Sequence, residues 1–223
     1  MPIVPIIILF VAGMIALVIF GFMSAAKRRK ALMAVAARRR MHFSADHDRG
    51  TDERFPNFEC LDRGHNRYAY NILTGHVAGQ WATGFDYHYE TGSGDDETSH
   101  HLSAVILQSP IPLRPLLVRP EGFFDSVKAF FGFDDIDFES AQFSRRFYVQ
   151  SPDRRWAYDV IHQGMMEYLM AAPQFSLQFD SSYIIAWREK RFEPADFDAA
   201  FETVCGIFDR LPEYLIRQQT GRG

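Results

Sequence analysis

Histidine and carboxylate side chains near one loop are the residues of this chain most suited to metal chemistry. The chain has eight histidines, and four residues around the loop could share an ion: Asp95, Asp96, His100 and His101. Zinc or manganese would suit that mixture of imidazoles and carboxylates better than calcium. The chain has no His-Glu-x-x-His motif, and Cys60 and Cys205 lie too far apart in sequence for a zinc spacing. We therefore expect an exposed loop, with no metal and no cofactor.

Acid–base catalysis is the second chemistry that the residue types allow. Asp86 and His88 lie on one face of an alternating segment, and His162 follows later in the chain. These three residues would form a hydrolase-like site if the fold brought them together. The sequence has no Gly-x-Ser-x-Gly elbow and no glycine-rich phosphate loop. It therefore favours a non-enzymatic domain, with a membrane-associated hydrolase as the alternative.

A basic segment near the N-terminus is the strongest charge feature. It contains no acidic residue, and its seven basic residues are Lys27, Arg28, Arg29, Lys30, Arg38, Arg39 and Arg40. Such residues fix the topology of a membrane segment and attract anionic lipid headgroups. We expect these side chains at the headgroup level, and a lipid or small-molecule sensor at the inner membrane face is a further alternative function.

The basic segment follows an uncharged apolar run at residues 3–23. At about 1.5 Å per residue, this run matches a hydrocarbon core of roughly 30 Å, so we expect a transmembrane helix. A cleaved signal peptide is the rival interpretation, but its positive charge would precede a shorter apolar run. The positive-inside rule places the N-terminus outside and the remaining chain in the cytoplasm, at the inner membrane.

The rest of the chain is acidic. Seven of the 24 basic residues lie in the basic segment, so residues 41–223 carry 17 basic against 28 acidic residues. A nucleic-acid partner would require a basic face, so we expect none. The expected partners are the bilayer, through residues 3–23, anionic headgroups, and a protein partner that the sequence does not identify.

The domain organisation follows from composition. Residues 24–41 are rich in helix-forming residues and predict a helical stalk, whereas residues 42–54 are polar and predict a linker. The remainder, residues 55–217, is large enough for one globular domain.

Aromatic and β-branched content, alternation and turn residues predict strands along the domain. The expected strands are 68–74, 77–90, 101–108, 116–119, 142–150, 175–179 and 183–187. The strand at 77–90 alternates so regularly that we expect it to be half-buried.

Helical patterns follow. Phe123–Phe131 predicts a short helix, Ser151 should cap a helix whose apolar face includes Trp156, and residues 193–211 should form the last helix. The expected fold is α+β, with a mainly antiparallel sheet, interspersed helices and a C-terminal helix.

A family resemblance rests on short aromatic motifs. They comprise Phe138-Glu139, Phe143, Phe147, Val149, Ser151, Asp153, Met166 and Phe192-Glu193, with Asn71 to Gly75 and Phe85 to Tyr87 earlier in the chain. On these residues, positions 55–215 resemble a widespread family of bacterial single-pass membrane-anchored proteins of unknown function. The chain departs from the family at His162-Gln163, where members often carry Thr-Pro. The resemblance implies an anchored cytoplasmic domain and no particular activity. The function expected from the whole sequence is a membrane-tethered cytoplasmic interaction or scaffold domain.

Overall fold

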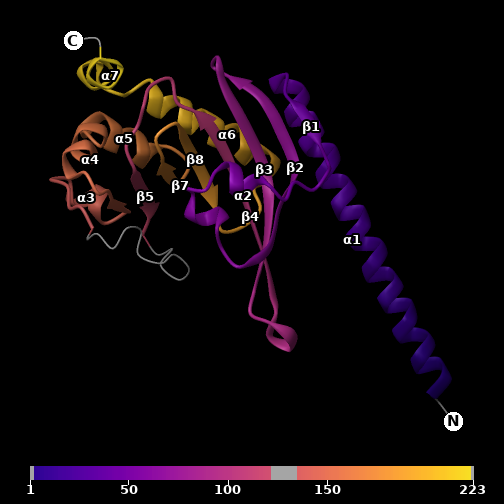
Figure 1. Ribbon diagram of the computed structural model, residues 1–223. Helices are drawn as coiled ribbons and strands as arrows, with labels where there is room; N and C mark the ends of the chain where they lie inside the picture. The colour runs from indigo at the N-terminus through magenta and orange to yellow at the C-terminus, as the bar shows by residue number, and fades with distance from the viewer. Residues whose placement is uncertain (1–2, 122–134, 222–223) are drawn as a thin grey trace.

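The protein is described here by a computed structural model that covers residues 3–121 and 135–221, with side chains described from residue 10 apart from positions 11, 12 and 16. The helix predicted at Phe123–Phe131 lies outside the described residues. An eight-stranded sheet forms the centre, in the order β1-β2-β3-β4-β8-β7-β5-β6, and all of its pairings are antiparallel (Figure 1). The α+β fold with a mainly antiparallel sheet is therefore confirmed.

The strands differ greatly in length. Three long strands form a meander, namely β2 (His65–Val77), β3 (Gln80–Thr91) and β4 (Thr98–Gln108). The shorter strands are β1 (His42–Ser44), β5 (Leu116–Pro120), β6 (Phe147–Gln150), β7 (Ser176–Phe179) and β8 (Tyr183–Arg188). Ala78 and Gly79 both have positive φ and form the two-residue turn between β2 and β3, as tight hairpins require.

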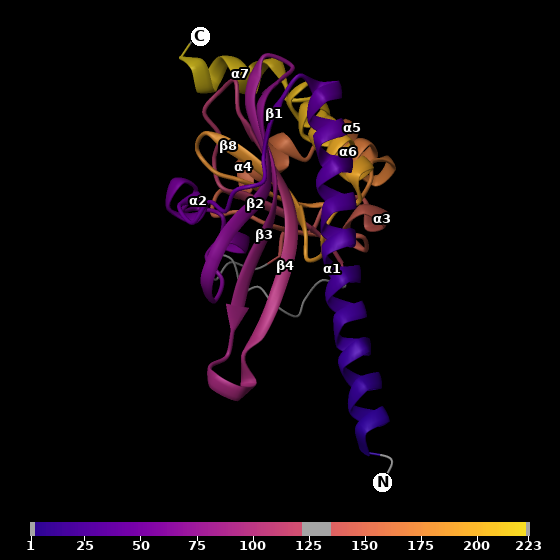
Figure 2. The same cartoon turned by 90° about the vertical axis from the view of Figure 1, so that its right-hand side faces the viewer.

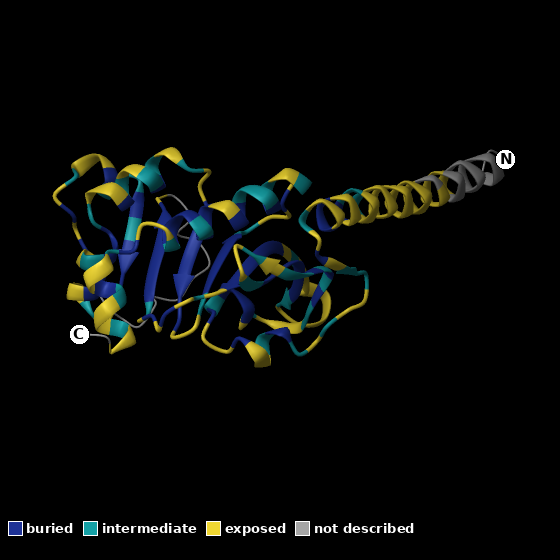
Figure 3. Cartoon of the chain, turned by 90° about the horizontal axis from the view of Figure 1, so that it is seen from above, coloured by how far each residue is buried: buried dark blue, intermediate teal, exposed yellow. Residues whose placement is uncertain are grey.

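Helices and the strand face that they cover form the larger core. The longer helices are α1 (Ile3–Arg39), α4 (Arg154–Val160), α5 (Gln163–Ala171), α6 (Pro194–Phe208) and α7 (Glu213–Thr220). The side chains of Leu32, Val35, Trp156, Phe197 and Phe201 are among those that pack on this face. Figure 3 shows the buried strands beneath this helical layer.

A smaller core covers the opposite face of the long strands. It is built from α2 (Thr51–Arg54), a 3-10 turn at Glu59–Leu61, and buried Phe55, Phe58 and Tyr87. Both faces of β3 are consequently buried from Ala82 to Tyr89. The half-burial predicted for this strand is therefore wrong, because α1 and α6 cover the face that carries Ala82, Gly84 and Asp86.

Residues 42–54 are not a linker. They contain β1, which pairs with β2 through Phe43↔Leu73, and α2. The prediction failed because the polar side chains of this segment bond to one another and to the sheet: Asp48 pairs with Arg54, and its backbone bonds to Ala69.

Two further predicted elements are corrected at their boundaries. The strand expected at 142–150 begins as a short helix, α3 (Ala141–Ser144), and only β6 is extended. The helix after Ser151 is capped by Asp153 instead, whose side chain accepts from the N–H of Trp156.

Helix α1 leaves the domain as one continuous element. Its C-terminal half packs on the sheet, while its N-terminal half stands clear and points the same way as the β3–β4 hairpin (Figures 1 and 2). Within the part of the chain that the structure describes, no helix is both long enough and apolar enough to span a membrane. The structure thus does not support the transmembrane helix predicted at residues 3–23.

Candidate functional site

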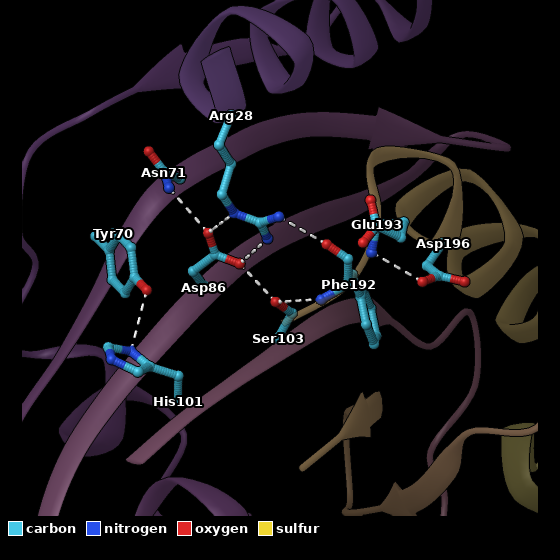
Figure 4. A network of polar contacts seen from close by, with 9 residues as sticks. All are labelled: Arg28, Tyr70, Asn71, Asp86, His101, Ser103, Phe192, Glu193 and Asp196. Carbon is cyan, nitrogen blue, oxygen red and sulfur yellow. Dashed lines mark hydrogen bonds and ion pairs between the residues drawn. The ribbon is translucent and has the colours of Figure 1, made fainter. Parts of the chain in front are cut away.

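Asp86 is the centre of a buried polar network on the helix-covered face of the sheet. Its carboxylate accepts from Arg28 Nε at 2.8 Å and Nη2 at 2.5 Å, from Asn71 Nδ2 at 2.8 Å, and from the Ser103 hydroxyl at 2.5 Å (Figure 4). Asp86 is fully buried. A buried carboxylate is stable only when such donors satisfy it, and here every donor comes from a different element.

The register of the sheet positions these donors. Tyr70 and Ser103 lie opposite Asp86 on the two neighbouring strands, so their side chains share its face. A β-bulge between Tyr70 and Leu73 adds one residue to β2, and Asn71 in this bulge has a φ of 52°. Asparagine tolerates that left-handed conformation, and the bulge directs its amide toward Asp86.

Arg28 links α1 to two parts of the domain at once. Its Nη1 donates to the carbonyl of Phe192 at 2.8 Å, and the N–H of Phe192 donates to the Ser103 hydroxyl at 2.9 Å. Burial lowers the pKa of Arg28, but the hydrogen bond and charge of Asp86 outweigh burial and raise it above its ordinary value. The Arg28 guanidinium therefore stays charged, and its hydrogen bonds fix α1 against the sheet and the loop before α6.

Aromatic and imidazole rings extend this face toward the hairpin tip. The Tyr68 ring stacks between His47 and His88, with centroid distances of 4.3 and 4.6 Å, and the Tyr70 hydroxyl lies 3.2 Å from His101 Nδ1. Burial, followed by the charge of Asp86, raises the pKa of Tyr70 to about 12. Burial, followed by the charge of Arg191, lowers the pKa of His101. Both groups are therefore neutral at pH 7 and serve as hydrogen-bonding rather than charged surfaces.

A groove lies between α1 and the loop before α6. It has a volume of about 540 Å³ and is lined by α1 residues from Phe20 to Ala31 and by Arg191, Glu193 and Pro194. Arg28 forms part of its wall, so the groove adjoins the Asp86 network. The arrangement could hold a ligand that is partly anionic and partly apolar.

The basic residues predicted to meet headgroups fall into two groups. Arg28 binds Asp86, while Arg38 and Arg39 both bind Asp198 on α6, and Arg39 also reaches Glu202 at 3.0 Å. These three side chains hold α1 on the domain. The other four are exposed and have no ion-pair partner among the described residues: Lys27, Arg29, Lys30 and Arg40.

The three residues of the hydrolase alternative do not form one site. Asp86 is occupied by Arg28, Asn71 and Ser103, and His88 bonds to Glu90 at 3.0 Å. His162 is the N-cap residue of α5, and its Nε2 lies 2.9 Å from the carbonyl of Arg210, which follows α6. In the described structure these side chains therefore serve three separate contacts.

The residues of the alternative metal site also point apart. His100 bonds to Thr91 at 2.7 Å and stacks on Tyr89, whereas His101 faces Tyr70 on the other side of β4. Asp95 and Asp96 lie in an exposed 3-10 turn at the tip, Gly94–Asp96. A different set, His65, Glu90 and Glu97, places its potential ligand atoms within 4.8 Å of one another, but His65 already bonds to Glu97.

The Asp86 network could not be assembled from sequence, although one signal pointed to it. Asp86 stands in the middle of a strand whose neighbours are apolar or small, and a carboxylate at such a position needs a cationic or donor partner. The sequence did not identify Arg28 as that partner, because the two residues are 58 positions apart and any of seven basic side chains could have served.

No family model matches the chain, and no curated protein matches it. Among solved structures, the chain is similar to the crystal structure of the mycobacterial trehalose monomycolate transport factor A, TtfA, with a TM-score of 0.59. Sequence identity is 12%, and the alignment covers 82% of this chain and 92% of that chain. At this identity the similarity shows a shared fold. The resemblance to a family of membrane-anchored proteins stays a prediction.

Proposed function

We propose that the protein is a membrane-tethered, non-enzymatic factor that serves lipid transport from the cytoplasmic face of the inner membrane. The observation that carries the proposal is the apolar half of α1, fixed to the sheet by the buried Arg28–Asp86 pair. A flexible tether would allow the domain any orientation. This rigid connection gives it one orientation relative to the helix, and hence to a bilayer that receives the helix.

The exposed apolar side chains of α1 support membrane association. Phe10, Leu17, Phe20 and Phe22 are 69–75% exposed, and no folded part of the described chain covers them. Contiguous exposed apolar surface of this kind is unfavourable in water and marks a membrane or protein contact. From the uncharged sequence run at residues 3–23 we infer a membrane anchor, and the basic residues after it favour a cytoplasmic domain.

The fold shared with TtfA, a protein named for trehalose monomycolate transport, supports lipid transport as the process served. A domain without a described catalytic constellation can act there by holding a lipid or a protein partner at the membrane surface. We propose that the domain binds a protein partner there, as the sequence also predicted.

Membrane association is tested on the full chain by flotation with phosphatidylcholine vesicles. The variant Leu17→Glu/Phe20→Glu should lose flotation, because each charge in an apolar helix centre costs about 3 kcal/mol. The matched control Met33→Glu/Ala34→Glu adds the same charge to exposed positions of α1 beyond Lys27 and should float like the wild type. Equal flotation of both variants would reject the membrane tether.

The lipid-transport part of the proposal is tested in the cells that make the protein. Depletion should leave newly labelled envelope glycolipid on the inner side of the membrane, and the wild-type chain should restore its export. The Leu17→Glu/Phe20→Glu variant should fail to restore export, whereas the Met33→Glu/Ala34→Glu control should succeed. Unchanged glycolipid export after depletion would reject this role while leaving membrane attachment intact.

A further inference from the structure

We propose that the groove between α1 and the loop before α6 binds the anionic headgroup of a bilayer lipid, with Lys27 and Arg191 contacting its phosphate. This inference rests on the proposed function, because it requires the apolar half of α1 to lie in a membrane. It adds to that function a specific ligand, an anionic lipid headgroup, and the two residues that would bind it.

The lining of the groove has the two chemical parts of a phospholipid. Phe20, Ala25 and Pro194 supply apolar surface, and Lys27 and Arg191 supply positive charge. Both cations are exposed and neither has an ion-pair partner among the described residues. A phosphate between them would form charge-assisted hydrogen bonds, while the first acyl carbons would lie along Phe20.

The lining of the groove carries a net positive charge. The positive charge of Arg28 is neutralised by Asp86, which lies behind the groove wall. The carboxylate of Glu193 accepts from the backbone of Asp196 in the capping box at the start of α6. Glu193 keeps its negative charge, so the lining sets two unpaired cations, Lys27 and Arg191, against one carboxylate and remains net positive.

The groove is also preformed. Arg28 holds one wall, α1, while its bond to the Phe192 carbonyl holds the other wall next to Arg191. The two walls belong to residues more than 160 positions apart, yet they are joined by a side chain that is only 16% exposed. A preorganised site loses less conformational entropy when the headgroup binds.

The position of the groove selects a lipid over a soluble anion. Phe20 and Gly21 belong to the apolar run, and Lys27 is the first charged residue after it. The groove thus spans the boundary between apolar and charged parts of α1, which is where phosphates lie in a bilayer that receives the helix.

The test is a titration of the full chain in neutral detergent with dioleoylphosphatidylglycerol, counting bound lipids by native mass spectrometry. Lys27→Gln/Arg191→Gln should weaken binding about thirtyfold, since each of the two basic residues contributes about 1 kcal/mol near the headgroups and 1.4 kcal/mol corresponds to a factor of ten. The control Arg29→Gln/Lys30→Gln removes the same charge from exposed positions of α1 outside the groove and should change the Kd less than twofold. Dioleoylphosphatidylcholine should bind the wild type more weakly than dioleoylphosphatidylglycerol.

Several results would overturn the inference. An equal loss in both double variants would assign binding to the general charge of the basic segment. Competition by millimolar inorganic phosphate as strong as that of the lipid would assign the groove to a soluble anion. Circular dichroism melting of each variant checks that the fold is retained. Flotation of the wild type with phosphatidylcholine vesicles tests the membrane tether separately. If the wild type floats but the two double variants bind the lipid with equal affinity, only the headgroup site is rejected.

Discussion

At the scale of single residues, Asp86 on β3 connects α1 to the sheet by accepting hydrogen bonds from Arg28. Asp86→Ala leaves Arg28, Asn71 and Ser103 facing a buried site without an acceptor. Breaking a buried pair by removing one partner costs about 3–5 kcal/mol. We expect the free energy of unfolding, measured with urea, to fall by about that amount.

The control for this substitution is Glu202→Ala. Glu202 also forms an ion pair with an arginine of α1, but its side chain is 74% exposed, and exposed pairs contribute about 0–1 kcal/mol. A loss of less than 1 kcal/mol for Asp86→Ala would show that solvent replaces Asp86 and that the network does not hold α1.

Arg119 on β5 is also a buried charged residue, but we expect its replacement to preserve or raise the free energy of unfolding. It is 7% exposed, and its Nε and Nη1 have no hydrogen-bond partner among the described residues, although its guanidinium lies over the Tyr148 ring. Burial lowers its pKa, which shows that the site disfavours the charge. We expect Arg119→Met to preserve or raise the free energy of unfolding, by up to about 1 kcal/mol, because it removes unsatisfied donors.

A urea titration of Arg119→Met beside Arg114→Met checks this expectation. Arg114 is about half-exposed and pairs with Asp153, so its loss should cost less than 1 kcal/mol. If Arg119→Met lowered the free energy of unfolding by 2 kcal/mol or more, the stacking on Tyr148 and the nearby acidic residues would outweigh the unsatisfied donors.

Sequence reasoning at the residue scale was successful for core aromatics and unsuccessful for ion pairs. Trp156 was expected on an apolar helix face and is 2% exposed. Arg38 and Arg39 were expected at headgroups and instead bind Asp198, because hydrophobic periodicity reports burial but not which acidic residue lies opposite a given cation.

The contact between α1 and α6 should depend on pH at the scale of elements. Burial raises the pKa of Asp198, but the hydrogen bonds from Arg39 and Arg38 outweigh burial and lower it. An acid with a lowered pKa stabilises the fold above its unfolded-state pKa of about 3.9 and loses that contribution as pH falls further. We expect the free energy of unfolding to decline below about pH 4, and less steeply in Asp198→Asn.

Denaturant unfolding between pH 2.5 and 7 measures this slope. Asp209→Asn is the control, because Asp209 is an exposed residue at the end of the same helix. A wild-type slope in Asp198→Asn would show that other carboxylates control the acid response.

The close packing of α6 on the sheet depends on Gly84 in β3. A Cβ at this position would lie 3.0 Å from Phe197 Cδ1 and 3.1 Å from Phe201 Cζ, both on α6. We expect Gly84→Ala to cost about 1–3 kcal/mol by overpacking, as measured by thermal unfolding.

The control for Gly84 is Gly50→Ala. Its φ is −101°, and a Cβ there would have no neighbour closer than 3.6 Å. The Gly84 prediction fails if the two variants melt at the same temperature.

Predictability also differed between elements. The long strand β3 followed from period-two alternation, and β2 and β4 followed from aromatic and β-branched content and from the loop at the hairpin tip. The alternation also suggested one exposed face for β3. That face carries the small residues Ala82 and Gly84, which allow α6 to approach closely, and small side chains give no hydrophobic signal. The short polar strand β1 gave no pattern at all, because edge pairing depends on the partner strand.

At the scale of the whole molecule, α1 belongs to two environments. Its N-terminal half exposes apolar side chains, while Leu32, Val35 and Ala36 of its C-terminal half are at most 2% exposed in the main core. The stalk expected at residues 24–41 is thus a structural part of the domain. The sequence could not show this, because alanine and arginine are frequent both in exposed helices and in docked ones.

Truncation separates these two roles of α1. A fragment of residues 24–223 keeps Arg28, the buried residues of α1 and β1, so we expect it to melt within a few degrees of the full chain and to lose vesicle flotation. A fragment of residues 55–223 removes the partner of Asp86 and four buried core side chains, and it exposes the edge of β2. Burying one Leu or Val side chain contributes about 1.5–3 kcal/mol, so these losses together approach the whole stability of a typical domain of about 5–15 kcal/mol. We expect the shorter fragment to lack a cooperative transition in circular dichroism. A cooperative transition near the full-chain melting temperature would show that residues 55–223 fold alone and that α1 serves only as the tether.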